Sequence, residues 1–257
     1  MLGSWFYHKR VRTAVSVFGS LFNNIYVLRQ NNAGETIAQV KVPLSYAPKR
    51  SFIERLNEMK DGEQSERRVA IKLPRMSFEI TAMAYSPERQ LPKTNSFSTA
   101  LSGSVNKRNE FYTSVPYDIS FDVNVYAKSQ DDALQMVEQI LPYFNPQYTV
   151  AVKPFGLTYP EIKEDVPISL QSVSFSDDFE GSVGDRRTII YTLSFTMKIA
   201  FYGPISSSPI VRTVNNNIYT MGDSDTFQLS MQTTPSPSGV SVDSDYGFNL
   251  AYLDSAQ

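Results

Sequence analysis

The segment from Tyr117 to Pro146 constrains the fold more than any other part of the chain. Its first half alternates apolar with polar residues, and the apolar set is Tyr117, Ile119, Phe121, Val123, Val125 and Ala127. A period of two is typical of a strand with one face on a core. Helical spacing follows at Ala133, Leu134, Val137, Ile140 and Leu141. Ser129 and Asp132 have capping-box spacing and Pro142 limits extension, so the sequence predicts a strand that leads directly into an amphipathic helix.

The same periodicities predict elements elsewhere in the chain. Helices are expected at residues 10–22 and 51–59, and strands at residues 25–30, 36–42, 76–84, 117–127 and 188–201. In Val166–Phe175 the apolar alternation slips by one residue, which predicts a β-bulge. The polar stretch Tyr85–Val115 between two strands indicates an extended hairpin arm or a mobile loop.

These elements define an α+β fold, mainly antiparallel β-sheet with flanking helices and long loop arms. We expect residues 1–203 to form a single domain. After Gly203-Pro204 the chain becomes rich in Ser, Pro and Asp, with short β-like patches such as residues 210–214 and 226–231. This composition predicts that residues 204–257 form an irregular C-terminal extension rather than a second globular domain.

Composition excludes several classes of function. The chain has no cysteine and one histidine, so thiol catalysis, disulfides and sites built from several histidines or cysteines are ruled out. The net charge of −2 gives no overall attraction to nucleic acid, and no apolar run is long enough to predict a membrane span. Residues 204–257 carry one Arg and five Asp, so the acidic bias lies in this extension.

No set of residues has the pattern of a catalytic or metal site. His8 would have to serve any Ser/His/Asp triad, but the pattern offers no positioned partners. Asp177, Asp178 and Glu180 could bind Ca²⁺ or form an acid/base pair, yet their spacing does not match an EF-hand and fits a solvated hairpin tip better. Residues 181–184 lack the Gly-Lys-Ser/Thr of a phosphate-binding loop. We therefore expect no enzymatic activity and no cofactor.

Basic and aromatic residues are the candidates for contacts with other proteins. Two arginine pairs each lie just before a predicted strand, and three further basic residues lie in the polar stretch. The candidates are Arg67, Arg68, Lys93, Lys107, Arg108, Arg186 and Arg187. They could pair with acidic partner surfaces, while ordinary solvation of strand ends explains the arginine pairs equally well. Trp5, Phe6 and Tyr7 could anchor the N-terminus to a neighbouring subunit, but core packing is the preferred interpretation.

Several runs resemble the tail completion and sheath stabiliser proteins, or tail terminators, of T4-like contractile-tailed phages. In chain order these runs are SLFNNIYVLRQ, VPLSYAPKRSFIERLN, LPRMSFEI with PKTN, DDALQMVEQILPYFNP, and GDRRTIIYTLSFTMKIAFYGP with IVRT. The resemblance covers about residues 1–214, and VEQILPYFNP is its most distinctive run.

The resemblance implies a structural protein of the virion that is assembled in the host cytoplasm. It implies a homo-hexameric ring that caps the tail tube and contractile sheath, stabilises the sheath, and offers the neck of the head an attachment surface. The implied partners are the tail sheath protein, the tail tube or tube-terminator protein, and neck proteins, without a membrane or specific nucleic acid. An alternative from another class is a β-rich carbohydrate-binding or adhesion module with stacking aromatics, and a hydrolase is a third, weakened by the single histidine.

Overall fold

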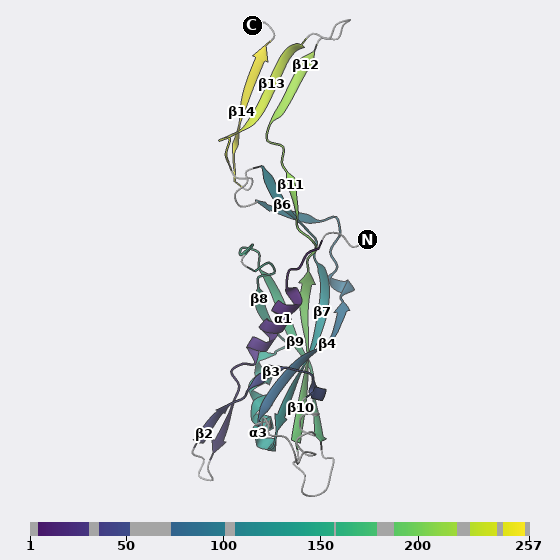
Figure 1. Cartoon of the computed structure of the whole chain (residues 1–257), viewed down its shortest axis with the longest axis vertical. Coiled ribbons are helices and arrows are strands. Elements are labelled where there is room, and N and C mark those ends of the chain that lie inside the picture. The colour runs from purple at the N-terminus through teal and green to yellow at the C-terminus, as the bar shows by residue number, and fades with distance from the viewer. Residues whose placement is uncertain are drawn as a thin grey trace, which may run out of the picture. The chain divides into compact units, whose positions relative to one another are not determined.

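The computed structural model describes residues 5–30, 36–51, 73–100, 106–156, 158–178, 188–219, 227–240 and 244–254. Contacts divide the chain into two units, which we call the large unit (Tyr7–Gln90 and Val115–Phe201) and the small unit (Met1–Phe6, Leu91–Ser114 and Tyr202–Gln257). Figure 1 labels the elements of both. The predicted helix at 51–59 falls almost wholly outside the described residues.

A six-stranded sheet forms the framework of the large unit. Its order is β3-β4-β7-β10-β9-β8, with only the β3–β4 pair parallel. The strands are β3 (Leu44–Tyr46), β4 (Arg75–Tyr85), β7 (Val115–Ala127), β8 (Gln147–Val152), β9 (Glu164–Asp178) and β10 (Thr188–Phe201). A separate antiparallel hairpin joins β1 (Tyr26–Gln30) to β2 (Thr36–Lys41). The mainly antiparallel α+β fold class is thus confirmed.

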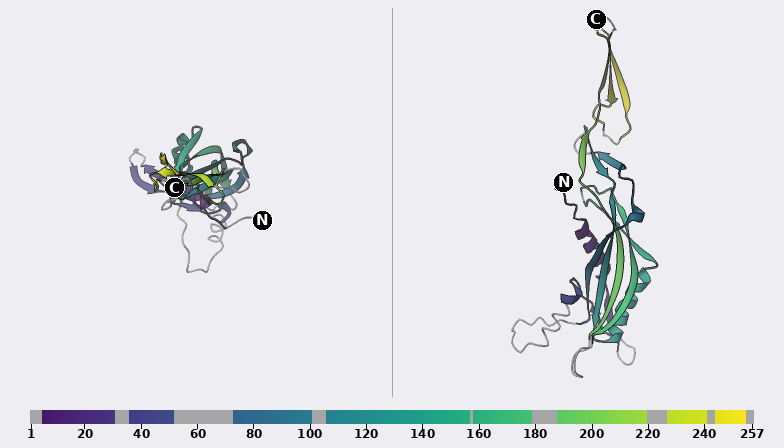
Figure 2. Two further views of the ribbon diagram at one scale, coloured as in Figure 1. Left: turned by 90° about the horizontal axis from the view of Figure 1, so that it is seen from above. Right: turned by 90° about the vertical axis from the view of Figure 1, so that its right-hand side faces the viewer.

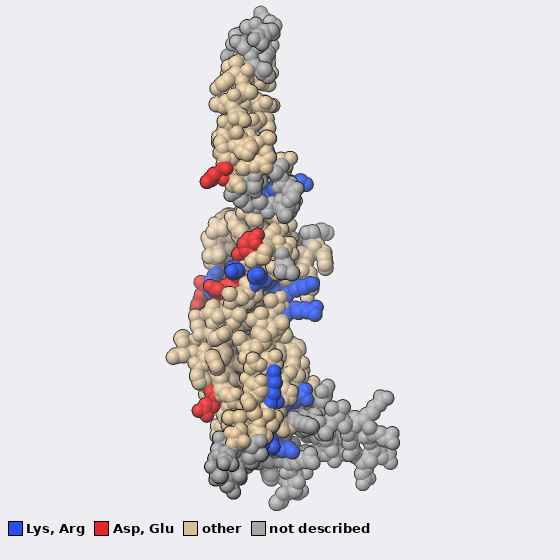
Figure 3. Space-filling view, turned by 90° about the vertical axis from the view of Figure 1, so that its left-hand side faces the viewer, with Lys and Arg blue, Asp and Glu red and all other residues tan. Residues whose placement is uncertain are grey.

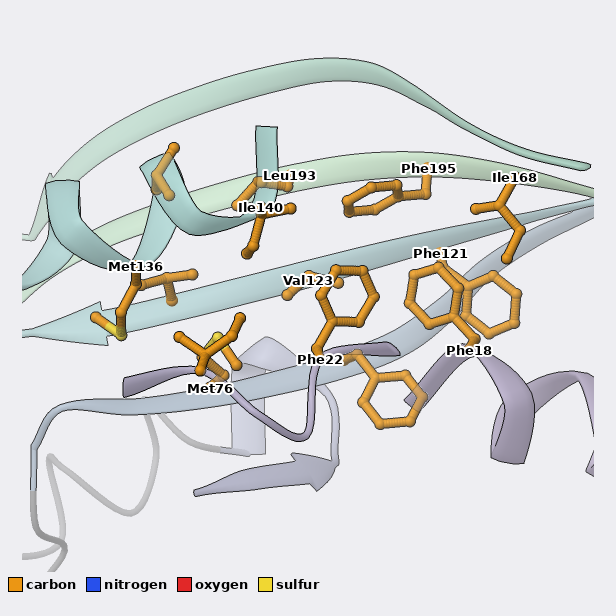
Figure 4. Packing of buried hydrophobic residues seen from close by; sticks show 14 of the residues in the cluster. Phe18, Phe22, Met76, Phe121, Val123, Met136, Ile140, Ile168, Leu193 and Phe195 are labelled. Atoms are coloured by element: carbon orange, nitrogen blue, oxygen red, sulfur yellow. The ribbon is translucent and has the colours of Figure 1, made fainter. Parts of the chain in front are cut away.

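Two helices complete the core on one face of this sheet. They are α1 (Arg10–Leu21) and α3 (Gln130–Ile140), followed by the 3₁₀ turn η2 (Leu141–Tyr143). Phe18 of α1 is fully buried and stacks on Phe121 of β7, with ring centroids 4.2 Å apart, beside Phe195 of β10. Figure 4 shows how the helix side chains meet those of the strands. The alternation in the strands and the helical spacing in α1 and α3 place the apolar residues of each element on one side of it. These apolar sides face one another and form a single core.

Close packing fixes Gly19 in α1. A Cβ atom at this position would lie 2.7 Å from Cζ of Phe78, closer than nonbonded carbon atoms approach. Any larger residue at this position would therefore require the ring of Phe78 in β4 to shift.

The phase slip predicted in residues 166–175 is a β-bulge in β9. Ser194 of β10 pairs with Ser172, and the next residue, Phe195, pairs with Leu170. Gln171 is the extra residue between them. The bulge moves the core-side positions of β9 from even to odd residue numbers: Ile168 pairs with Met197 and Val173 pairs with Leu193. The apolar residues therefore stay on one face of the sheet, where Val166 and Ile168 are buried and Val173 and Phe175, farther along the strand, are exposed.

The start of α3 differs from the predicted capping box. Ser129 occupies the N-cap position, but its side chain makes no capping hydrogen bond; its carbonyl instead accepts from the amide of Ala133. Asp131 and Asp132 lie in the first turn, where negative charge interacts favourably with the helix dipole.

A buried ion pair ties the start of α1 to the sheet. Nη2 of Arg10 donates to the carboxylate of Glu164 in β9, and its Nε donates to the carbonyl of Ala200 in β10 at 3.0 Å. The other oxygen of Glu164 accepts from the amide of Ala200 at 3.0 Å. Burial raises the pKa of the Glu164 carboxyl, and the charge of Arg10 opposes that rise without cancelling it.

The small unit is built from two three-stranded antiparallel sheets. One has the order β11-β6-β5, from β5 (Ser96–Ala100), β6 (Lys107–Tyr112) and β11 (Ser206–Pro209). The other has the order β12-β13-β14, from β12 (Val214–Tyr219), β13 (Phe227–Ser236) and β14 (Gly247–Asp254). Figure 2 gives two further views of these strands.

Two expectations for this unit can be compared with these strands. Of the alternatives for residues 85–115, the described part takes the hairpin form, with the 3₁₀ turn η1 (Pro87–Arg89) before β5 and β6. Between residues 204 and 257, regular pairing is more extensive than the Ser/Pro/Asp-rich composition indicated, because 24 residues of β12–β14 pair as one sheet. Alternation, rather than average composition, identifies these strands.

Candidate interaction surfaces

The described residues hold no cluster with the chemistry of an active site. Within them, no group of three or more His, Asp or Glu side chains could hold a metal ion. His8 is half-buried, and its ring packs edge-on against Phe155 with centroids 5.3 Å apart. Asp177 and Asp178 lie at the end of β9, and Glu180 falls outside the described residues. None of the helices described here has the length and apolar character needed to cross a membrane.

Polar side chains of the large sheet are paired with one another across its strands. Ser194 donates to Asp122 and Thr192 donates to Asn124, each at 2.8 Å. Tyr126 and Ser77 hydrogen-bond through their hydroxyls at 3.1 Å, and burial raises the pKa of Tyr126 to about 12. These hydrogen bonds cross between β4, β7 and β10, so they help to specify the register of the strands.

The hairpin β1–β2 is attached to α3 by two glutamine side chains. The amide of Gln135 accepts from the backbone N–H of Leu28 at 2.9 Å and donates to its carbonyl at 3.1 Å. Gln139, one turn later, makes the same two bonds with Tyr26, at 3.2 and 2.7 Å. The two amides therefore pair with one edge of β1 as a neighbouring strand would.

Removing both glutamines is expected to release the hairpin from α3. In Gln135→Ala/Gln139→Ala, four hydrogen bonds are lost, each contributing about 0.5–1.5 kcal/mol. Hydrogen exchange should then speed up at the amides of Tyr26 and Leu28, while the amides of β10 keep their protection. Glu138→Ala, on the same helix between the two glutamines, is the matched control. We call Gln135 and Gln139 with their four hydrogen bonds to β1 the glutamine clamp. Unchanged hydrogen exchange at Tyr26 and Leu28 would show that this clamp does not hold the hairpin.

A largely apolar pocket lies beside this attachment. Its volume is about 520 Å³, and its walls come from the end of α1 with the residues after it, the end of α3, η2 and the start of β8. Phe22, Phe144 and Tyr148 line it, and Glu138 contributes a carboxylate. Such a hollow can accept an apolar side chain of another protein.

The predicted interface residues are described only in part. Lys93 and Lys107 are exposed and Arg108 is half-buried, and all three belong to the small unit. Lys107 and Arg108 are neighbours in β6, so they point to opposite faces of its sheet. Arg67, Arg68, Arg186 and Arg187 lie outside the described residues. Figure 3 shows Lys and Arg side chains dispersed on one face of the protein, not gathered into a continuous basic surface.

The N-terminal aromatics correct one prediction from the sequence. Core packing was the preferred interpretation of Trp5, Phe6 and Tyr7, but all three are exposed, Trp5 to 90%. The core of the large unit starts at Ala14 and is filled by Phe18 and Phe22, so it leaves these aromatics outside.

Sequence reasoning missed two surface features. The glutamine clamp joins residues 107 and 113 positions apart, a pairing that periodicity cannot show. The apolar alternation of Phe248, Leu250 and Tyr252 in β14 was available as a strand signal, but the polar composition around it concealed it.

The described residues combine a packed α+β core with aromatic side chains exposed on the surface. Comparison with known families gives the class: residues 5–251 match the model of the T4-like virus Myoviridae tail sheath stabiliser. The chain belongs to this family, whose members are structural proteins of the contractile tail of bacteriophage virions.

A tail protein of another phage is similar in sequence to this chain. The chain is similar to the tail completion protein gp15 of Enterobacteria phage T4, with 29% identity over 221 residues. The alignment covers 84% of this chain and 79% of the relative. The resemblance noted from the sequence is thereby confirmed.

Proposed function

We propose that six copies of this protein form a ring that caps the finished tail tube and contractile sheath. The ring stabilises the sheath and offers the attachment surface for the neck of the head. The observation that carries the proposal is the family match over residues 5–251, which includes parts of both units. The name of the T4 relative, tail completion protein, supports a position at a tail end.

The proposed partners are the tail sheath protein, the tail tube or tube-terminator protein, and neck proteins, and no membrane or specific nucleic acid takes part. Assembly takes place in the host cytoplasm, and no enzymatic step or cofactor is involved. The chain lacks cysteine and carries a single histidine, which supports this assignment over a hydrolase. The family match supports it over a carbohydrate-binding module.

A ring with cyclic symmetry requires two different contact surfaces on each subunit. Exposed aromatics and the strands of the small unit supply surfaces of different chemistry. Arg67, Arg68, Lys93, Lys107, Arg108, Arg186 and Arg187 remain the proposed basic contacts, and of these the described Lys93 and Lys107 are both exposed.

Complementation tests the proposal. A phage that lacks this gene should produce heads and separate tails, and wild-type protein supplied from a plasmid should restore joined particles. The variant Lys93→Glu/Lys107→Glu should yield about tenfold fewer joined particles than the wild-type protein does. The reason is that the new glutamates would face an acidic surface of the partner and repel it. Lys128→Glu/Lys198→Glu, which reverses two exposed lysines of the large unit, is the control for net charge. Normal joining without the protein would overturn the proposed function; normal joining with the first variant would remove Lys93 and Lys107 from the interface.

A further inference from the structure

The sheet β12-β13-β14 has one apolar face. Strand register aligns Val214 with Thr233 and Leu250, and Asn216 with Met231 and Tyr252. Directly paired residues point to the same side of a sheet, as do residues two apart in a strand. The shared face therefore carries Val214, Ile218, Met231, Phe248, Leu250 and Tyr252. The opposite face carries polar residues such as Asn217 and Ser230, which hydrogen-bond at 2.8 Å.

This apolar face is open to solvent in the single chain. Phe248 is 66% exposed, Tyr252 60% and Leu250 54%. Figure 3 shows neither basic nor acidic atoms over most of the visible surface of these strands. A contiguous exposed surface of this kind marks an interaction site, and its lack of charge indicates an apolar or aromatic occupant.

The same chain exposes a segment of matching chemistry at its N-terminus. Trp5, Phe6 and Tyr7 are consecutive, lie outside any helix or strand, and are exposed. The exposed Lys9 and Arg12 follow them. The apolar face itself lacks charge, but the C-terminal segment that contains it, residues 204–257, carries one Arg and five Asp, so the two chain segments have opposite net charge. Aromatic anchors beside complementary charge are typical of protein interfaces.

We propose that Trp5–Tyr7 of one copy packs on the apolar face of β12–β14 of the next copy. This inference rests on the proposed ring and names the contact that closes it. The contact joins two different surfaces, as cyclic assembly requires. Packing of two identical β12–β14 faces would instead produce a two-fold dimer. If Trp5 packed on the β12–β14 sheet of its own chain, its side chain would be covered. It is instead 90% exposed in the single chain, which favours a contact with another copy.

The absence of native cysteine allows a direct test by disulfide capture. In Trp5→Cys/Leu250→Cys, a disulfide can form only where the two Cα atoms come within about 4.4–6.8 Å. Tails isolated from complemented cells should yield a ladder of covalent multimers up to six copies on a non-reducing gel, and reduction should collapse it. Trp5→Cys/Ala251→Cys, with the second cysteine on the opposite face of β14, is the matched control and should give no ladder.

Each other outcome has a distinct meaning. A covalent dimer with Leu250→Cys alone would show that two apolar faces pack on each other, and an internal disulfide in the double variant would show docking within one chain; either result overturns the proposal. No crosslink on tails that join heads normally would overturn this contact while leaving the proposed function intact. Loss of head joining is read from the same samples, so the two failures are distinguishable.

Fluorescence gives a second readout, because Trp5 is the only tryptophan. Its emission should shift to shorter wavelength as copies associate, and Trp5→Phe removes the signal. Phe248→Ser/Leu250→Ser/Tyr252→Ser should weaken association by about 30-fold or more. Asn249→Ser/Ala251→Ser on the opposite face should leave association unchanged. Association of equal strength in the apolar-face variant, with the same shift of emission, would contradict the proposed contact.

Discussion

Replacing Phe18 by alanine is expected to lower the free energy of unfolding by about 3–5 kcal/mol. Its ring is fully buried and lies within 6 Å, centroid to centroid, of the rings of Phe22, Phe78, Phe121 and Phe195. Alanine would leave a cavity where α1 meets three strands of the sheet, and these strands cannot collapse into it without breaking register. The measurement is unfolding of the purified protein in urea.

Val11→Ala is the matched control, because Val11 lies on the exposed side of the same helix. This change should alter the free energy of unfolding by no more than about 0.5 kcal/mol. A loss below about 1 kcal/mol in Phe18→Ala would show that the aromatic cluster does not hold α1 to the sheet.

The second large effect is expected at Arg10. Arg10→Met leaves the buried carboxylate of Glu164 without its cation, which destabilises a protein by about 3–5 kcal/mol. The loss of stability should be larger at pH 7 than at pH 4. Burial already raises the pKa of Glu164, and removal of Arg10 raises it further, so in acid the carboxyl takes up a proton and its burial costs less.

The double variant Arg10→Met/Glu164→Gln tests the cause. Removing both charges should recover more than half of the stability lost in Arg10→Met, because no uncompensated charge remains buried. A double variant that is as unstable as the sum of its two single variants would show that packing of the arginine side chain, rather than its charge, stabilises the start of α1.

Strands β7 and β10 were predictable because their alternation matches their burial. Phe121, Val123, Leu193 and Phe195 face the core, and each is flanked by polar residues of the opposite face. The bulge at Gln171 was predictable for the same reason, since the slip in apolar phase marks the residue at which pairing changes register.

Other features depend on tertiary geometry that a linear pattern does not contain. The aromatics Trp5–Tyr7 have the composition of core residues, yet the core is already filled by α1. Ser129 has the spacing of a capping box, but its side chain does not cap α3. Gln135 and Gln139 look like ordinary exposed helix residues until β1 is placed beside them.

The sequence predicted the class of protein, but it did not identify the surfaces that contact partners. The absence of cysteine and the single histidine excluded thiol catalysis and sites built from several of these residues, and the resemblance indicated the family. The basic candidates were chosen from charge and position alone, and only Lys93, Lys107 and Arg108 lie in the described part of the chain. The apolar face of β12–β14 emerges only from strand register, because its residues come from three separate segments.

Electron cryomicroscopy of purified tails tests the central claim most directly. Tails that carry this protein should show a six-fold ring at the head-proximal end, in contact with both tube and sheath. Tails from a phage that lacks the gene should lack this ring and have a less stable sheath. Density for the protein along the length of the tail or at its opposite end, or an unchanged head-proximal end in its absence, would contradict the account.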